Sequence, residues 1–243
     1  MAVVINGNGT VTGIAVGGLP DGIVDNGTMA DDAIAIADLA ATGTASSTTF
    51  LRGDNSWAAA GGGAWELIQT QTVGTSVNAI NFTTGITSAY DNLCLMLTDV
   101  KYTGMGSYQL SLRVSTDAGS TWKSGNSDYS YGLTRFKQDG GVWHSNNTSN
   151  STIHFGLQSH PGSEAQSYAN FRLYFNAPAD TTQPFNMSGS GNLHGYSGTT
   201  REWGNFVLTG MYWTEVAING IQVTQAGGYF SEGKLSLYGI KHA

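Results

Sequence analysis

The sequence is poor in charge and in cysteine, and it has no long apolar run. Charged residues make up 11% of the 243 residues, less than half of the roughly 25% that is usual in soluble proteins. Cys94 is the only cysteine, which excludes an intrachain disulfide, and its place in the apolar residues 93–97 predicts a buried thiol. No stretch approaches the ~18 apolar residues of a membrane span, and the first residues lack the pattern of a signal peptide. We therefore expect assembly in a cytoplasm, without secretion and without membrane insertion.

Basic residues are few and do not cluster. The chain holds 10 Lys and Arg against 17 Asp and Glu, which gives a net charge of −7. The densest basic pair, Arg135 and Lys137, fits the solvent face of a strand, whereas a phosphate backbone requires grouped Lys and Arg. We expect no nucleic acid among the partners of this protein.

Glycine and the aromatic residues are abundant, and the aromatic residues are unevenly placed. The 34 glycines, together with many Ser, Thr and Asn, favour short strands joined by tight turns. Of the 6 Trp, 11 Tyr and 9 Phe, only Phe50 and Trp57 precede Ala58. This contrast predicts an attachment segment over residues 1–63 and a head with its own core over residues 64–243.

The attachment segment shows two local signals. The turn Asn6-Gly7-Asn8-Gly9 between short apolar stretches predicts a hairpin within residues 1–16. Thr28 and Asp31 form a capping box ahead of apolar residues at three- and four-residue spacing, which predicts a short helix ending near residue 41. The alternation of apolar and polar residues in the same stretch leaves a strand open.

Residues 1–63 lack the bulk for a core of their own. A short helix and a lone hairpin are both marginal in water. Identical copies around an axis would supply the missing surface, and the alternative is a disordered segment. The residues that we expect in a shared core are Ile23, Val24, Ile34, Leu39, Phe50 and Leu51.

The triplet Arg52-Gly53-Asp54 is the integrin-ligand motif, and its context predicts a turn instead. It lies between the apolar pair Phe50 and Leu51 on one side and Trp57 on the other. Gly53 permits a reversal of the backbone, and Asp54 or its neighbour Asn55 can close an Asx turn. We interpret the triplet as structural.

Alternating apolar and polar residues predict strands through the head. In residues 110–114 and 171–175 every second residue is apolar, as in a strand with one face in a core. Roughly eight to ten such strands indicate an all-β head, an antiparallel β-sandwich of jelly-roll type. The other strand candidates are residues 93–97, 153–157, 206–212, 216–218, 221–223 and 235–240.

Residues 115–122 match the Asp-box pattern S-x-D-x-G-x-x-W of sialidases and other β-proteins. In those proteins the box shapes a hairpin turn, so Asp117 would accept backbone N–H groups, Gly119 would take a positive φ and Trp122 would pack beneath. A sialidase propeller carries several copies and an arginine cluster, and this sequence shows neither. We interpret the box as a structural turn.

Sequence signals for catalysis are weak. The chain has no G-x-S-x-G elbow, H-E-x-x-H motif or P-loop, and its 5 histidines are dispersed. A carboxylate pair for glycoside cleavage would need two groups ~5–10 Å apart, which a sequence cannot place. We expect no enzyme activity, no cofactor and no metal site. The carboxylates that could form such a pair are Glu164, Asp180, Glu202 and Glu215.

Three polar segments with aromatic residues favour binding of sugars. Residues 143–147, 192–196 and 201–203 combine aromatic faces with Asn, His or Arg donors, and we expect them in loops. Sugar rings are recognised by stacking and hydrogen bonds, although aromatic residues of a β-sandwich are more often core. The receptor-binding candidates are Trp143, His144, Asn146, His194, Tyr196, Arg201 and Trp203.

Three strings resemble a known family. VTGIAVGGLPDGIVDNGTMADDAI (residues 11–34) and GTASSTTFLRGDNSWA (residues 43–58) resemble the N-terminal part of tailed-bacteriophage fibre and virion structural proteins, especially short tail fibres of phages of aquatic bacteria. GKLSLYGI (residues 233–240) resembles the closing strand of such fibre heads. The second string marks a fibre-like connector and carries no chemistry.

The resemblance implies a function and partners. It implies a homotrimer on a phage particle, with the N-terminal segment attached to other virion proteins of the tail or capsid and the head presented to a host cell-surface glycan or protein. The alternative hypothesis for the same segments is a capsid decoration or head-fibre protein without a receptor. A tailspike that depolymerises polysaccharide is a third hypothesis.

Overall fold

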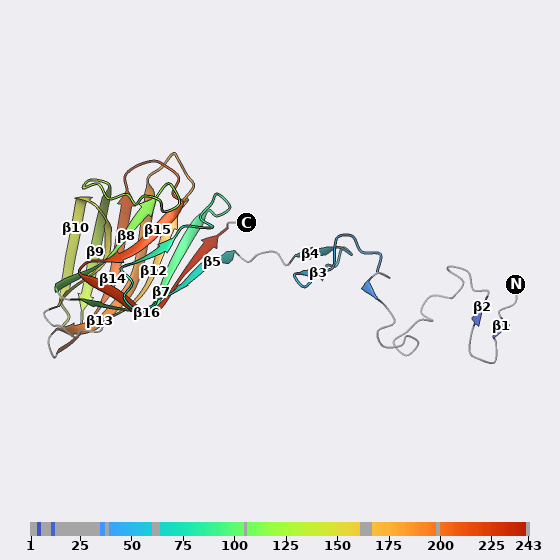
Figure 1. Cartoon of the computed structure of the whole chain (residues 1–243), viewed down its shortest axis with the longest axis horizontal. Coiled ribbons are helices and arrows are strands. Elements are labelled where there is room, and N and C mark those ends of the chain that lie inside the picture. The colour runs from blue at the N-terminus through green and yellow to red at the C-terminus, as the bar shows by residue number, and fades with distance from the viewer. Residues whose placement is uncertain are drawn as a thin grey trace. The chain divides into compact units, whose positions relative to one another are not determined.

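The structure is a computed structural model, and the chain divides into two units, Met1–Gly61 and Gly62–Ala243. All of the named elements are strands (Figure 1). Among the residues described, no helix combines the length and apolar character needed to cross a bilayer. The structure describes residues 4–5, 11–12, 35–36, 39–59, 64–104, 106–160, 167–197 and 200–241.

The first unit contains two short hairpins. β1 (Val4–Ile5) pairs antiparallel with β2 (Val11–Thr12), which confirms the predicted N-terminal hairpin. β3 (Thr49–Leu51) pairs with β4 (Trp57–Ala59). Most of the predicted helix lies outside the described residues, and residues 39–41 at its end are not helical.

The integrin-type triplet forms the turn between β3 and β4. The Arg52 N–H donates to the Ser56 carbonyl at 2.9 Å, and Asp54 Oδ1 accepts the Ser56 N–H at 3.2 Å as an Asx turn. The left-handed residue is Asn55, with φ 59°, and Gly53 does not have a positive φ. The predicted turn is confirmed, but the reversal occurs at Asn55 because Asn tolerates this conformation better than other side chains do.

The residues expected in a shared core are only partly described. In the single chain Phe50 is 47% exposed and Leu51 is 41% exposed, while Leu39 is half-buried. Ile23, Val24 and Ile34 lie outside the described residues. The short β3–β4 hairpin therefore leaves apolar side chains in water within its own chain.

The second unit is a sandwich of two antiparallel sheets (Figure 1). One core cluster contains buried residues of both sheets, and it confirms the all-β sandwich expected from the sequence. The large sheet has the order β10 (Val142–Asn150), β9 (Tyr129–Lys137), β14 (Thr200–Tyr212), β13 (Phe185–Ser197), β12 (Ser167–Asn176), β7 (Asn92–Gly104), β16 (Gly228–Ile240), β5 (Trp65–Thr72). The small sheet has the order β11 (Ile153–His160), β8 (Gly106–Ser115), β15 (Gly220–Gln225), β6 (Ala79–Phe82).

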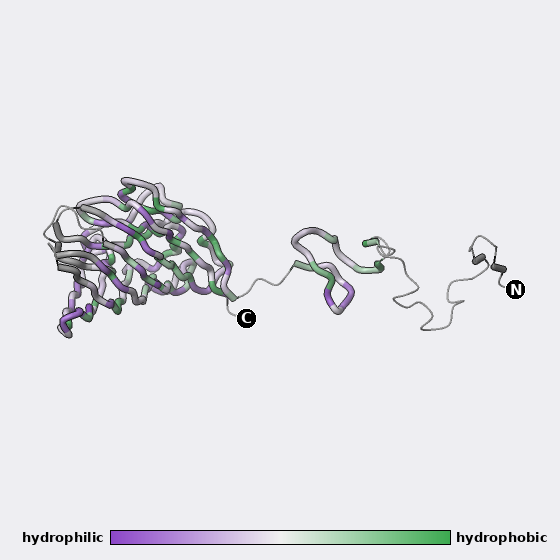
Figure 2. Tube along the Cα trace, turned by 90° about the horizontal axis from the view of Figure 1, so that it is seen from below, coloured by the Kyte–Doolittle hydropathy of each residue, from purple (hydrophilic) through white to green (hydrophobic). Residues whose placement is uncertain are grey.

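The core forms because strand residues alternate between the two faces of each sheet. In β12, Phe171 and Phe175 are buried while Arg172 and Tyr174 are exposed. Phe171 meets Phe155 of the small sheet edge-on, with ring centroids 5.3 Å apart. Figure 2 shows the resulting mixture of polar and apolar residues along the strands. The two sheets are thus joined by aromatic contacts at the centre of the unit.

Three sequence predictions are wrong in this unit. Residues 216–218 are a connection and not a strand, and their apolar character reflects the burial of Ile218, whose N–H donates to the Pro178 carbonyl at 2.6 Å. The three polar segments expected in loops belong to β10, β13 and β14. Arg135 does not face solvent: it is 8% exposed, its guanidinium lies over the Phe206 ring, and Gly204 leaves room for it.

The Asp-box residues form the turn that follows β8. Asp117 Oδ1 accepts the Thr121 N–H at 2.8 Å and the Ser115 hydroxyl at 2.7 Å. Hydrogen bonds from the Thr121 hydroxyl and N–H and from Ser115 lower the pKa of Asp117 to about 2. Gly119 has φ +85°, and a Cβ there would approach the Trp122 ring. The Asp117 carboxylate therefore accepts hydrogen bonds within the turn and stabilises it.

Candidate binding site

A run of small residues in β13 forms a depression on the outer face of the large sheet. Ser188 and Ser190 are exposed there, between the longer side chains of β12 and β14. Gly189 and Gly191 face the core, where a Cβ at Gly189 would come within 2.5 Å of the Arg172 carbonyl oxygen and one at Gly191 would meet the Asn170 carbonyl and the Phe171 ring. The two glycines allow β12 to lie close to β13. The short side chains of Ser188 and Ser190 leave a depression on the outer face of β13.

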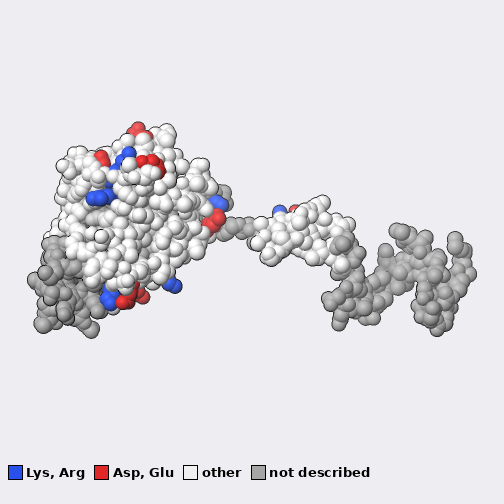
Figure 3. All heavy atoms as spheres, in the orientation of Figure 1, with Lys and Arg blue, Asp and Glu red and all other residues white. Residues whose placement is uncertain are grey.

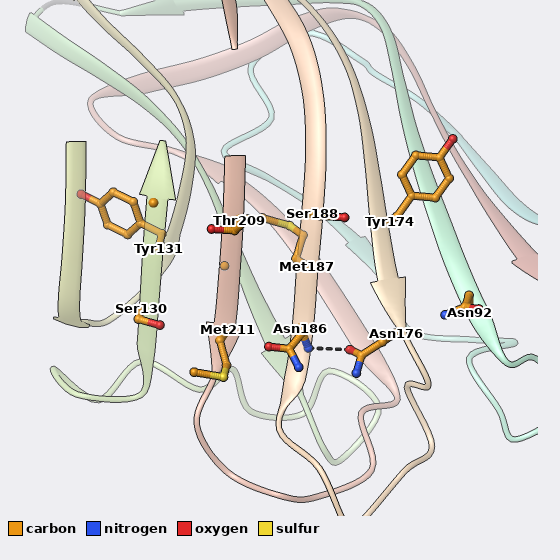
Figure 4. A pocket seen from close by; sticks show the side chains of 12 residues that line it. Asn92, Ser130, Tyr131, Tyr174, Asn176, Asn186, Met187, Ser188, Thr209 and Met211 are labelled. Carbon is orange, nitrogen blue, oxygen red and sulfur yellow. Dashed lines mark hydrogen bonds between the residues drawn. The ribbon is translucent and has the colours of Figure 1, made fainter. Parts of the chain in front are cut away.

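The first hollow of this depression has a volume of about 520 Å³ and no charged lining residue. Figure 4 shows Ser188 and Thr209 side by side between Tyr174 and Ser130. Asn176 Oδ1 accepts the Asn186 N–H at 2.6 Å, which fixes this amide at the end of the hollow. The lining residues are Asn92, Ser130, Tyr131, Gly132, Tyr174, Asn176, Asn186, Met187, Ser188, Thr209, Gly210 and Met211.

A second hollow of about 620 Å³ continues the first along the same strands. On β13 it begins at Ser190, two residues from Ser188, and on β14 at Val207, two residues from Thr209. Arg172 is its one charged lining residue. We call the two hollows together the outer trough. The lining of the second is Met96, Leu97, Thr98, Phe136, Asn170, Phe171, Arg172, Ser190, Gly191, Asn192, Asn205, Phe206 and Val207.

An aromatic cluster borders the first hollow. Trp65 of β5 meets Tyr174 edge-on with ring centroids 6.1 Å apart, and it meets Tyr238 of β16 at 6.0 Å. Trp65 is 46% exposed and Tyr174 is 41% exposed. Cys94, which pairs in register with both tyrosines, is fully buried as predicted, and burial raises the pKa of its thiol to about 11. The trough thus has flat aromatic faces beside its amides and hydroxyls.

The sequence-predicted receptor residues do not line the outer trough. His194 and Trp203 are opposite each other on β13 and β14, and Trp203 is exposed. Tyr196 and Arg201 are register partners whose side chains are not described. These four residues share one end of the hairpin that β13 and β14 form.

The three candidates in β10 are divided between the two faces of the sheet. His144 Nδ1 hydrogen-bonds the Thr134 hydroxyl at 3.0 Å on the outer face, and Asn146 lies two residues further on the same face. Trp143 pairs with the inward-facing Arg135 and is therefore on the other face, although it is exposed at this edge strand. The receptor-binding candidates therefore do not form one cluster of loops.

Sequence reasoning missed Tyr174, Ser188 and the asparagines of the trough except Asn192, which lies in the predicted segment 192–196. The available signal was the alternation Ser188, Ser190, Asn192, which is a period of two. The glycines between them replaced the apolar residues that would have marked a strand.

Charged groups are sparse on the visible face of the second unit. Figure 3 shows that the visible face of the second unit is mostly uncharged, with small groups of Lys and Arg beside Asp and Glu. Of the carboxylates considered for catalysis, Asp180 accepts the Thr182 N–H at 2.7 Å in a turn, Glu215 is exposed, and the side chains of Glu164 and Glu202 are not described. The described residues contain no group of three His, Cys, Asp or Glu that could hold a metal ion.

The outer face therefore combines a hollowed surface with polar and aromatic side chains. The trough offers hydrogen-bond donors and acceptors without a carboxylate, and aromatic rings stand at its border. No family model, curated protein or solved structure that was compared with this chain matches it.

Proposed function

We propose that this chain is a non-enzymatic fibre protein of a phage particle whose head binds a neutral glycan of the host surface in the outer trough. We infer a neutral glycan because the first hollow is uncharged and rich in amides and lies beside the Trp65–Tyr174 pair. The fibre role is supported by the resemblance of residues 11–34, 43–58 and 233–240 to phage fibre proteins.

The lining matches the chemistry of a sugar ring. A sugar presents hydroxyl groups at its edge and C–H groups on its faces. The side-chain amides of Asn176 and Asn186 both donate and accept hydrogen bonds, and so do the hydroxyls of Ser188 and Thr209. The ring of Tyr174 offers a flat apolar face with a polar tip. Neither a cation nor a carboxylate is needed for such a ligand.

We propose that three chains assemble through the first unit. The exposed Phe50 and Leu51 of the β3–β4 hairpin would be covered by sister chains, and three linked heads would convert weak single-site binding into avidity. Other virion proteins would hold the N-terminal end on the particle.

The assembly is tested by mass. Light scattering of the full chain should give a mass near three times 25.5 kDa. A variant with both Phe50→Asp and Leu51→Asp should shift to a single-chain mass, because charges in a shared apolar core are strongly unfavourable. Val207→Asp, which places one such charge at an exposed residue of the head, is the control. A monodisperse single chain of the natural sequence would contradict the trimer.

Filling the trough should abolish glycan binding. Ser188→Trp places a large ring in the first hollow from an exposed position, where substitutions usually change the free energy of unfolding by less than about 0.5 kcal/mol. On an array of neutral and acidic bacterial surface oligosaccharides, the natural chain should bind neutral members and Ser188→Trp should lose them.

The matched control for this experiment is Thr72→Trp. Thr72 of β5 is exposed on the outer face of the large sheet, as Ser188 is, but it lines neither hollow. It should retain the binding pattern of the natural chain. Neutral glycans that bind equally well to Ser188→Trp would place the ligand elsewhere and overturn the assignment.

A further inference from the structure

The outer face of the small sheet carries another hollow, which the outer trough does not include. Its volume of about 560 Å³ is within the size range of small-molecule sites. Its lining comes from β6, β8, β11 and β15 and the residues next to them, from Asn150 at the end of β10, and from residues 151–152 between β10 and β11. We call it the Arg113 hollow after its one charged lining residue.

The floor of the Arg113 hollow consists of buried polar side chains that have hydrogen-bond partners in two separate pairs. His154 Nδ1 and the Ser111 hydroxyl are hydrogen-bonded at 2.8 Å, and the His154 ring stands edge-on to Tyr131 at 4.8 Å. Gln222 Nε2 donates to Asn81 Oδ1 at 3.0 Å. Ser111, His154 and Gln222 are all buried although they lie on the outer side of the sheet. This floor is polar and fixed before any ligand arrives.

Arg113 lies beside this floor, two residues from Ser111 on the same face of β8 and opposite Gln222 of β15, and it has unused hydrogen-bonding capacity. Its Nε is buried and has no hydrogen-bond partner among the described residues. The lining contains no Asp or Glu, so the guanidinium is not neutralised within the hollow. A guanidinium presents a planar fork of donors that matches a carboxylate. One such cation in a hollow without acids favours a ligand with a single negative charge.

The rest of the lining selects among anions. The amides of Asn78 and Gln109 and the hydroxyl of Thr224 both accept and donate hydrogen bonds. Phosphate and sulfate bring many acceptors and few donors, which leaves the accepting atoms of the lining without partners. A sugar acid brings hydroxyl donors together with one carboxylate, and it uses both kinds of group.

We propose that the Arg113 hollow is a second saccharide site, specific for a hexuronate residue, with Arg113 pairing with its carboxylate. This site is on the opposite sheet from the outer trough and does not depend on the proposed function. A head with both sites would bind a mixed surface polysaccharide through neutral and acidic residues.

The test uses two ligands that differ only at the carboxylate. Saturation-transfer difference NMR on the full chain should give a signal about fivefold stronger for methyl glucuronide than for methyl glucoside at equal concentration, as one charge-assisted fork implies. Arg113→Gln should remove this preference, and Arg172→Gln, which changes the arginine of the outer trough, should keep it. Equal signals with Ser188→Trp, in which the outer trough is filled, or loss of the preference with Arg172→Gln alone, would overturn the proposal.

Two further arms separate this site from folding effects and from the outer trough. Ala79→Trp fills the hollow from the edge strand β6 and should also remove the preference, which keeps the test valid if Arg113→Gln unfolds. Ser188→Trp should leave it intact. Displacement of methyl glucuronide by inorganic phosphate at matched ionic strength would show a general anion site and would contradict the assignment to a sugar acid.

Discussion

Replacing Phe171 by alanine should lower the free energy of unfolding of the head by about 3–5 kcal/mol, the usual cost of removing a buried phenylalanine. Phe171 is 2% exposed and contacts Phe155 and Phe206, so its loss opens a cavity between the two sheets. The thermal midpoint should fall by roughly 10 °C for a unit of this size. Denaturant unfolding followed by tryptophan fluorescence measures the change.

Phe136→Ala is the matched control for this substitution. Phe136 belongs to the same sheet but is 46% exposed on the outer face. Its removal should cost less than about 1 kcal/mol, because little surface leaves the core. Equal losses for the two variants would contradict the sandwich core described above.

Acid should destabilise the head between pH 6.5 and pH 4 through His154. Burial lowers the pKa of His154 from 6.5 to about 4. The native state holds the ring neutral while the unfolded state accepts a proton below pH 6.5, so stability is present above that pH and is lost as the pH falls to about 4. The loss can reach about 3 kcal/mol, since one pKa unit corresponds to about 1.4 kcal/mol.

The acid effect is tested with His154→Gln. The glutamine keeps a polar group beside Ser111 but does not titrate, so the slope of stability against pH in this window should flatten. His144→Gln, the same substitution at an exposed position of β10, is the control. A natural chain whose stability is constant from pH 6.5 to pH 4.5 would show that His154 is not buried in its neutral form.

The strands that the sequence predicts are those with apolar residues on one face. Residues 110–114 and 171–175 show the period of two because their inner side chains fill the core. The sequence pattern does not predict β13, because Gly189 and Gly191 occupy inward-facing positions where apolar residues would otherwise be. The pattern does not predict β10 either, because β10 is an edge strand whose inner face is only partly covered and can carry polar residues.

For the candidate site, the sequence led to a prediction of sugar binding but did not give the place of the site. That prediction was based on aromatic residues among Asn, His and Arg, and the sequence does not show that the trough is built from strands far apart in the chain. Tyr174 and Asn92 come together with Thr209 only because β7, β12, β13 and β14 are neighbours in one sheet. This order depends on long-range pairing, which local patterns do not encode.

The most direct test of the outer trough is methyl NMR of the methionines. The side chains of Met96 and Met211 line the trough, Met187 is buried in the core beneath it, and the three other methionines of the sequence serve as internal references. With methyl-labelled methionine in the full chain, saturation with the best neutral oligosaccharide from the array should shift the signals of Met96 and Met211. Saturating binding that leaves the signals of Met96 and Met211 unchanged would contradict binding in the trough.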